Sequence, residues 1–210
     1  MWKFSVLKKQ FCLLVLSCLV SLQTMAADNL YSVFSIGYSD VEFIQDSNKG
    51  VGYKMAFGYQ FDPQWYVEAG YQQLIHDSLY ITDLPTSSAV TEAKHLQQGD
   101  ALFLAFLGKA SGPTGELFYR LGVLKTDLRG QYLLAGNSEC EFGQANVLAI
   151  ENFGTATLCD YDESGVAGVI GLGFDYFIGA RTMIRTELEY IKGQDNLTVA
   201  TATVGLRYNF

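Results

Sequence analysis

The sequence predicts an all-β fold, an eight-stranded antiparallel up-and-down transmembrane β-barrel, from three observations. Apolar and polar side chains alternate in eight segments with the two-residue period of a strand. The connections are short after the second, fourth and sixth segments and long after the third and fifth. One face of most segments carries aromatic and aliphatic side chains, whereas the other carries charges and glycine.

The composition of the 210 residues also favours β structure in one domain. Hydrophobic residues make up 49% and charged residues 17%, so the chain has enough apolar side chains to fold. It contains 13 Tyr, 14 Phe and 21 Gly but only 3 Pro, a mixture typical of strands rather than of helix bundles. The formal net charge of −8 argues against nucleic acid as a partner.

Residues 1–26 have the organisation of a secretory signal. Lys3, Lys8 and Lys9 form a basic start, and an apolar run follows at 11–22. This run is too short for a membrane-spanning helix, which needs about 20 residues. We therefore predict a signal peptide at 1–26 and a barrel domain at 27–210, whose formal charge becomes −11 because three lysines are removed.

The first three predicted strands cover residues 30–39, 51–61 and 65–72. Each alternates cleanly between an apolar and a polar or small side chain. The second and third are joined by a tight turn at Asp62 and Pro63, because Pro fixes φ and the Asp side chain bonds its own backbone.

The fourth and fifth predicted strands cover residues 101–109 and 117–124, on either side of a Gly/Pro turn. Both faces of the fourth strand are apolar. Phe103 and Leu107 lie on one face, and Leu102, Leu104 and Phe106 lie on the other. Its register therefore cannot be assigned from the pattern.

The last three predicted strands cover residues 168–176, 184–190 and 198–210. Glycine-containing turns separate them. The terminal strand is longer than most globular strands but suits a tilted membrane strand, and we expect it to pair with the first strand and close the barrel.

Two stretches, 75–98 and 127–165, lack a clear membrane-strand pattern and are predicted to be long loops, the first with a hairpin extension as the alternative. The second stretch holds Cys140 and Cys159, the two cysteines outside the signal. In an exported chain such a pair predicts one disulfide, which would stabilise the loop by about 3 kcal/mol.

A soluble lipocalin-like barrel has the same strand number and period, so the charged face decides between the two folds. In a lipocalin-like barrel this face meets water, and glycine has no reason to gather there. Here glycine accompanies the charges, which suits a narrow interior where long side chains pair. The opposite face suits lipid, where a charge at mid-depth costs about 2–4 kcal/mol. The predicted interior charge network consists of Lys54, Glu68, Arg120, Asp175, Arg185, Glu187, Glu189 and Arg207.

Three strand-turn units, at residues 59–62, 171–176 and 205–210, resemble the OmpA-like family of small Gram-negative outer-membrane barrels. The resemblance implies an outer-membrane location and a terminal strand read by the outer-membrane assembly machinery through Leu206, Tyr208 and Phe210. It also implies an interior pair of Glu68 and Arg185.

The chain departs from the family pattern in two respects. No inward lysine lies midway along the fourth strand, although Lys54 or Arg120 could replace it, and this puts a gating role in doubt. The sequence ends on the barrel strand, so the peptidoglycan-binding domain of OmpA is not expected.

The candidate chemical sites are weak. His76 and His95 are the only histidines, and Asp77, Ser78 and Asp83 lie near them in sequence, but no motif fixes a triad. Acidic residues flank both cysteines without the spacing of a calcium loop. We therefore expect no catalytic site, metal or cofactor.

We expect a monomer with a structural or surface-interaction role, of the adhesion or colonisation type, carried by its external loops. The expected partners are outer-membrane lipid, lipopolysaccharide and a host or cell-surface ligand. A wide pore does not fit, because side chains fill the interior of an eight-stranded barrel. A narrow ion channel and a lipid A-modifying enzyme remain as alternatives.

Overall fold

The computed structural model describes residues 29–43, 46–76, 93–135, 139–140, 143–150, 154–194 and 196–210. These ranges are almost entirely β-strand. No helix among them has the length and apolar character needed to span a membrane. The predicted signal peptide at 1–26 lies outside the described residues.

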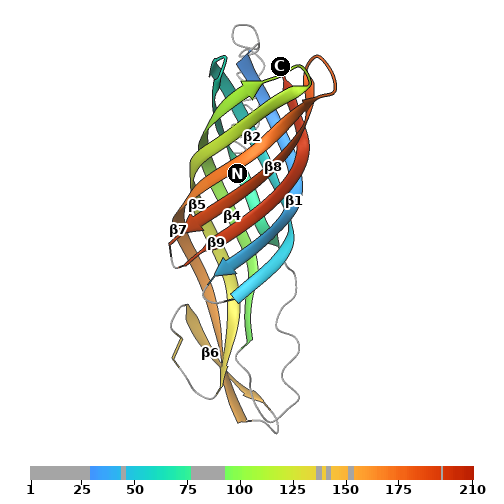
Figure 1. Ribbon diagram of the computed structural model, residues 1–210. Helices are drawn as coiled ribbons and strands as arrows, with labels where there is room; N and C mark the ends of the chain where they lie inside the picture. The colour runs from blue at the N-terminus through green and yellow to red at the C-terminus, as the bar shows by residue number, and fades with distance from the viewer. Residues whose placement is uncertain are drawn as a thin grey trace, which may run out of the picture.

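Eight of the nine strands close into an antiparallel up-and-down barrel, so the predicted fold class is confirmed (Figure 1). The first strand pairs with the last, from Tyr31 opposite Asn209 to Glu42 opposite Thr198. The closing strand thus leaves no free edge in the barrel wall. The strands are β1 (Leu30–Phe43), β2 (Asp46–Asp62), β3 (Trp65–His76), β4 (Ala93–Ser111), β5 (Gly115–Ala135), β6 (Gln144–Ile150), β7 (Gly154–Phe177), β8 (Thr182–Gly193) and β9 (Thr198–Asn209).

Three turns of two to four residues lie at one end of the barrel, which we call the short-turn end. They join β2 to β3, β4 to β5 and β7 to β8. In the first of them the Gln64 amide donates to Asp62 Oδ1 at 3.0 Å, the side-chain turn expected before the proline. Phe210 also lies at this end, where its amide donates to the carbonyl oxygen of Leu30 at 3.0 Å.

The outer face of the barrel is an apolar belt bounded by two rings of aromatic side chains. Large hydrophobic side chains point outward from all eight strands, and their exposure reaches 69% at Phe57. Such a belt is typical of a surface that faces hydrocarbon between two interfaces. The ring at the short-turn end includes Tyr59, Trp65, Tyr119, Tyr176 and Tyr208, and the ring at the other end includes Tyr38, Tyr53, Tyr71 and Tyr190.

The structure fixes the register of β4, which the sequence left open. Phe103 and Leu107 are buried inside the barrel, whereas Leu102, Leu104 and Phe106 are exposed on the belt. Both faces are apolar because this strand contributes to the interior packing as well as to the belt.

The expectation of a loop at 127–165 is wrong. The β5–β7 ladder runs without interruption from Gly115 opposite Tyr176 to Ala135 opposite Ala156, and β6 pairs with the other edge of β7. Figure 1 shows this extension, which we call the arm and define as residues 127–135, 144–150 and 154–164. The membrane pattern is missing from the arm because most of its outward side chains are polar, such as Arg129, Gln131, Asp160 and Asp162. The stretch at 75–98 is also partly strand, since β3 reaches His76 and β4 begins at Ala93.

Candidate functional site

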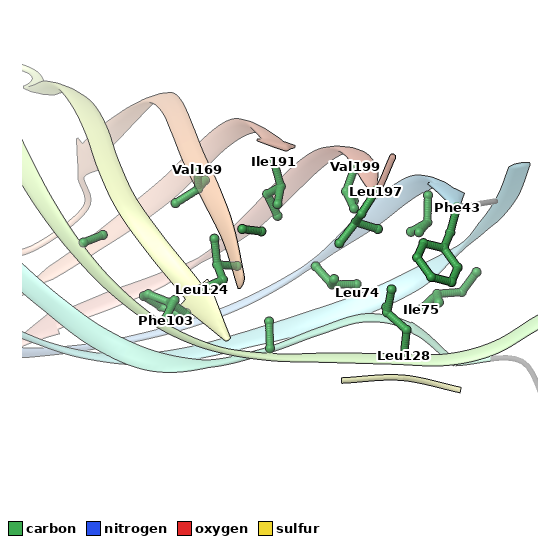
Figure 2. Packing of buried hydrophobic residues seen from close by; sticks show 14 of the residues in the cluster. Phe43, Leu74, Ile75, Phe103, Leu124, Leu128, Val169, Ile191, Leu197 and Val199 are labelled. Carbon is green, nitrogen blue, oxygen red and sulfur yellow. The ribbon is translucent and has the colours of Figure 1, made fainter. Parts of the chain in front are cut away.

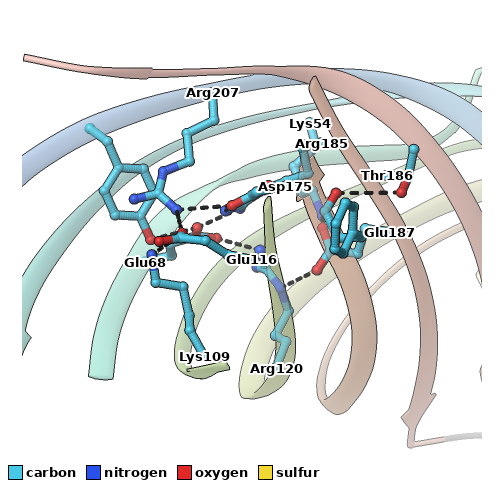
Figure 3. Close-up of polar contacts among 12 residues, drawn as sticks. Lys54, Glu68, Lys109, Glu116, Arg120, Asp175, Arg185, Thr186, Glu187 and Arg207 are labelled. Carbon is cyan, nitrogen blue, oxygen red and sulfur yellow. Dashed lines mark hydrogen bonds and ion pairs between the residues drawn. The ribbon is translucent and has the colours of Figure 1, made fainter. Parts of the chain in front are cut away.

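The interior of the barrel holds a charge network at the level of the belt (Figure 3). All eight residues predicted from the sequence are buried there, and the structure adds Lys109 and Glu116. The network is electrically neutral, because five cations face five carboxylates. The cations are Lys54, Lys109, Arg120, Arg185 and Arg207, and the carboxylates are Glu68, Glu116, Asp175, Glu187 and Glu189.

Arg185 on β8 is the centre of one half of the network. Its guanidinium binds Asp175 through two parallel hydrogen bonds of 2.7 and 2.8 Å and reaches Glu68 across the barrel at 2.6 Å. Arg207 then contacts Asp175 at 2.9 Å and Glu116 at 3.1 Å. The two-point Arg185–Asp175 pair is directional and joins the neighbouring strands β7 and β8, while the contact with Glu68 links β8 to β3 across the barrel.

Arg120 and Lys54 hold the other half. Arg120 Nε lies 2.5 Å from Glu187 Oε1, and its other end contacts Glu68. Lys54 contacts Glu187 and lies 3.0 Å from Glu189. Further hydrogen bonds to Glu189 from Gln72 at 3.1 Å and Thr201 at 3.2 Å satisfy the remaining carboxylate positions.

Sequence reasoning missed Lys109 and Glu116, which contact each other beside the β4–β5 turn. Lys109 ends the fourth predicted strand, whose register the pattern leaves open, and Glu116 lies between the Gly/Pro turn and the fifth predicted strand. The signal that could have found them is position, since Glu116 has the same inward parity as Phe118 and Arg120.

Aromatic rings pack between the charges. The Tyr31 hydroxyl donates to Glu68 Oε1 at 2.7 Å, and the Tyr31 ring centroid lies 3.9 Å from Arg207 Cζ. The Phe118 ring lies 4.4 Å from Arg185 Cζ. Gly58 is required beneath Tyr31, because a Cβ there would come within 2.1 Å of the ring. Glycine on the charged face therefore makes room for large side chains.

A second layer of the interior is apolar and lies next to the network, toward the arm (Figure 2). Ile191 lies two residues beyond Glu189 on β8, and Leu74 lies two residues beyond Gln72 on β3. Because six strands contribute, this layer extends across the barrel. We call it the apolar layer, and it consists of Val41, Phe43, Leu74, Ile75, Leu124, Leu128, Val169, Ile191, Leu197 and Val199.

The arm is packed on this layer and closed by a disulfide. The Tyr161 ring lies 5.9 Å from Phe43 and 6.3 Å from Tyr132, so the inner face of the arm continues the apolar layer. Cys140 and Cys159 are bonded, with Cα atoms 5.8 Å apart, and Cys159 is fully buried.

Polar cross-strand pairs cover the outer face of the arm. Asp160 accepts hydrogen bonds from Gln131 on β5 and, at 3.0 Å, from Asn146 on β6. Arg129 and Asp162 form an exposed ion pair at 3.1 Å. Within the described ranges, no group of three or more His, Cys, Asp or Glu side chains is placed to hold a metal ion.

Among the described residues, those considered for catalysis do not form a common site. His76 is exposed at the end of β3. His95 belongs to β4, while Asp77, Ser78 and Asp83 lie outside the described residues.

Leu206, Tyr208 and Phe210 all point outward on the belt. Their side chains are half-exposed, and the Tyr208 and Phe210 rings meet edge-on at 5.5 Å. They are therefore accessible from the surrounding membrane phase rather than from the interior.

Several proteins of known structure share this barrel fold. Solved structures with the same fold include Neisserial surface protein A (11% identity, 86% of this chain and 97% of that chain, TM-score 0.57). They also include the N-terminal barrel domain of Pseudomonas aeruginosa OprF (12%, 87% and 98%, 0.54) and Ail of Yersinia pestis (18%, 89% and 100%, 0.51). No curated protein sequence matches the chain. The family model described as "Outer membrane protein beta-barrel domain" matches residues 12–210, so the chain belongs to that family.

Proposed function

We propose that the protein anchors a stiff external arm in the outer membrane and uses it to contact another surface, a role of the adhesion or colonisation type. The observation that carries the proposal is the arm itself. Nine consecutive residue pairs extend the β5–β7 ladder from Asp127 and Ser164 to Ala135 and Ala156. A flexible loop would need none of this pairing.

The construction of the arm supports a binding role. Preorganisation lowers the entropy that is lost when a segment binds, and a disulfide, a third strand and a packed base all restrict the arm before any partner arrives. Its outer face bears Asp127, Asp160 and Asp162 against Arg129, which favours a partner with a neutral or positive surface. The name of Ail, an attachment invasion locus protein, belongs to the same class of role.

The interior supports an anchor more than the narrow channel considered above. An ion crossing the barrel would have to pass both the paired charges and the apolar layer. We expect no unitary conductance from the purified protein in planar bilayers, and stepwise currents would favour the channel.

Targeting and assembly complete the proposal. We propose that residues 1–26 are a cleaved signal peptide and that Leu206, Tyr208 and Phe210 are read by the outer-membrane assembly machinery. Their outward orientation supports this, because a recognition signal must be reachable before the barrel closes.

The register of the arm allows it to be shortened without cutting the barrel. Gly130 faces Tyr161, so residues 131–160 can be replaced by Asn-Gly, which closes a two-residue hairpin. Bacteria that display the full chain should adhere to epithelial cells or to immobilised matrix proteins and glycans, and the shortened variant should lose this adherence.

The control is Gln194→Ala, an exposed change in the β8–β9 turn at the same end of the barrel. Surface amount and the difference in gel mobility between boiled and unboiled samples should match in all three proteins. Adherence that survives shortening of the arm would overturn the proposal.

A further inference from the structure

The outer face of the barrel has a groove above β7, where the apolar belt meets the level of the arm. Its volume is about 420 Å³, and Leu121, Ile170, Tyr190 and Lys192 line it together with Gly168. Gly168 faces outward, and a Cβ added there would have only one atom within 4 Å, the carbonyl oxygen of Lys192 at 4.0 Å. The groove is thus open because β7 presents no side chain at Gly168, between Val166 and Ile170.

Two lysines flank this groove on the neighbouring strands. Lys192 on β8 lies opposite Gly168, and Lys125 on β5 lies opposite Val166. Adjacent strands are about 4.8 Å apart, and Lys125 lies two residues along β5 from Val123, the residue level with Lys192, so the two lysine backbones are separated by about 12 Å across β7. Flexible side chains of this length can converge on one anion between them.

Neither lysine is neutralised by a carboxylate in the part of the chain that the structure describes. Lys192 Nζ donates to Thr198 Oγ1 at 2.6 Å, and Lys125 is exposed. The acids just above them are engaged elsewhere, since Asp127 accepts a hydrogen bond from Ser164 and Asp162 pairs with Arg129.

Lys49, at the same end of the barrel, differs from Lys125 and Lys192 because it has a carboxylate partner. Asp40 lies 3.1 Å from Lys49 Nζ, and this hydrogen-bonded pairing raises the pKa of that ammonium above its ordinary value. A lysine that already has a carboxylate partner offers less to an external anion.

The depth of the groove indicates what occupies it. Tyr190 belongs to the aromatic ring that marks the interface, so Leu121 and Ile170 lie in hydrocarbon while the two ammonium groups reach the headgroup level. An occupant needs an apolar chain below and a negative charge above. A second copy of the chain docked here about a two-fold axis would bring like charges together, which disfavours it.

We infer that this groove binds a phosphorylated glycolipid of the outer leaflet, lipid A, with an acyl chain along Leu121 and Ile170 and a phosphate between Lys125 and Lys192. The site is separate from the arm and does not depend on the proposed adhesive role.

The test is native mass spectrometry of the purified full-length protein titrated with diphosphorylated lipid A. The variant Lys125→Gln/Lys192→Gln should bind at least about 25-fold more weakly, because each basic residue near the surface adds roughly a factor of five. Gly168→Leu, which fills the groove and leaves both lysines, should weaken binding as well.

The matched controls are Lys49→Gln, which removes a paired lysine, and Ala69→Leu, which places the same side chain on the belt at β3. Both should bind lipid A as the wild-type protein does. Unchanged binding by the lysine double variant and by Gly168→Leu would overturn the inference. Equal binding of dephosphorylated lipid A, or of phosphatidylglycerol, would overturn the assignment to the phosphorylated glycolipid.

Discussion

The charge network and the apolar layer are two neighbouring levels of one interior, and they are held together by different physics. In the network each cation contacts one to three named carboxylates, whereas the apolar layer has no directional contact at all. Both levels are almost fully buried. The stability of the network therefore depends on which charged residues are present and how they are oriented. The stability of the apolar layer depends on how well its side chains fill the interior.

The difference shows how a narrow barrel tolerates ten buried charges. Removing ions from water is costly, and the cost is recovered only when every charge has good partners. The apolar layer keeps water from the arm side of the network, which strengthens the remaining electrostatic contacts. Each level thus needs the other, but a substitution should damage them by different amounts.

Arg185→Leu should have the largest effect. It leaves Glu68 and Asp175 without their main partner, and breaking a buried pair in this way costs about 3–5 kcal/mol. The free energy of unfolding of the reconstituted barrel in urea measures this cost. A loss below about 1 kcal/mol, the range of exposed pairs, would mean that the network is hydrated rather than dry.

Ile191→Ala should cost somewhat less, about 2–4 kcal/mol, because it removes buried volume without leaving a charge unpaired. The same urea titration applies. Leu188→Ala is the control, since Leu188 lies on the same strand but faces the belt, where lipid can fill the space. Equal losses at the two positions would show that the apolar layer is loosely packed.

Most of the charge network could be predicted from the sequence, whereas the apolar layer could not. Charged residues such as Glu187 and Glu189 stand out against an apolar face, so parity alone assigned them to the interior. Leu74, Ile191 and Val199 have the same inward parity, but apolar residues on both faces erase the alternation near the ends of the strands. The register of β4 was ambiguous for that reason, and only pairing with β3 and β5 decides it.

The arm was missed for the opposite reason. Its outward residues, including Arg129 and Asp160, are polar because they face water, so they lack the apolar face that marks a membrane strand. Cross-strand partners far apart in sequence hold it, as Arg129 and Asp162 do, and a single sequence does not encode which residues face each other.

Loss of the disulfide should weaken the arm and spare both levels of the barrel. In Cys140→Ser/Cys159→Ser the arm should lose about 3 kcal/mol, the loop-closure value for a loop of this length. Hydrogen exchange of the β6 amides should accelerate, while the gel mobility of the unboiled barrel stays unchanged. Faster exchange in β8 near Thr182, at the short-turn end, would contradict this separation.

Arg129→Gln should have the smallest effect, and it tests whether burial is what makes the loss of an ion pair costly. Arg129 pairs with Asp162 as Arg185 pairs with Asp175, but the side chains of the outer pair are 59% and 63% exposed. Water solvates the Asp162 carboxylate after its partner is removed. The loss in the free energy of unfolding should therefore stay within about 0–1 kcal/mol and become smaller at high salt. The free energy of unfolding in urea at low and high salt measures it. A loss as large as that of Arg185→Leu would show that solvent exposure does not weaken the Arg129–Asp162 pair.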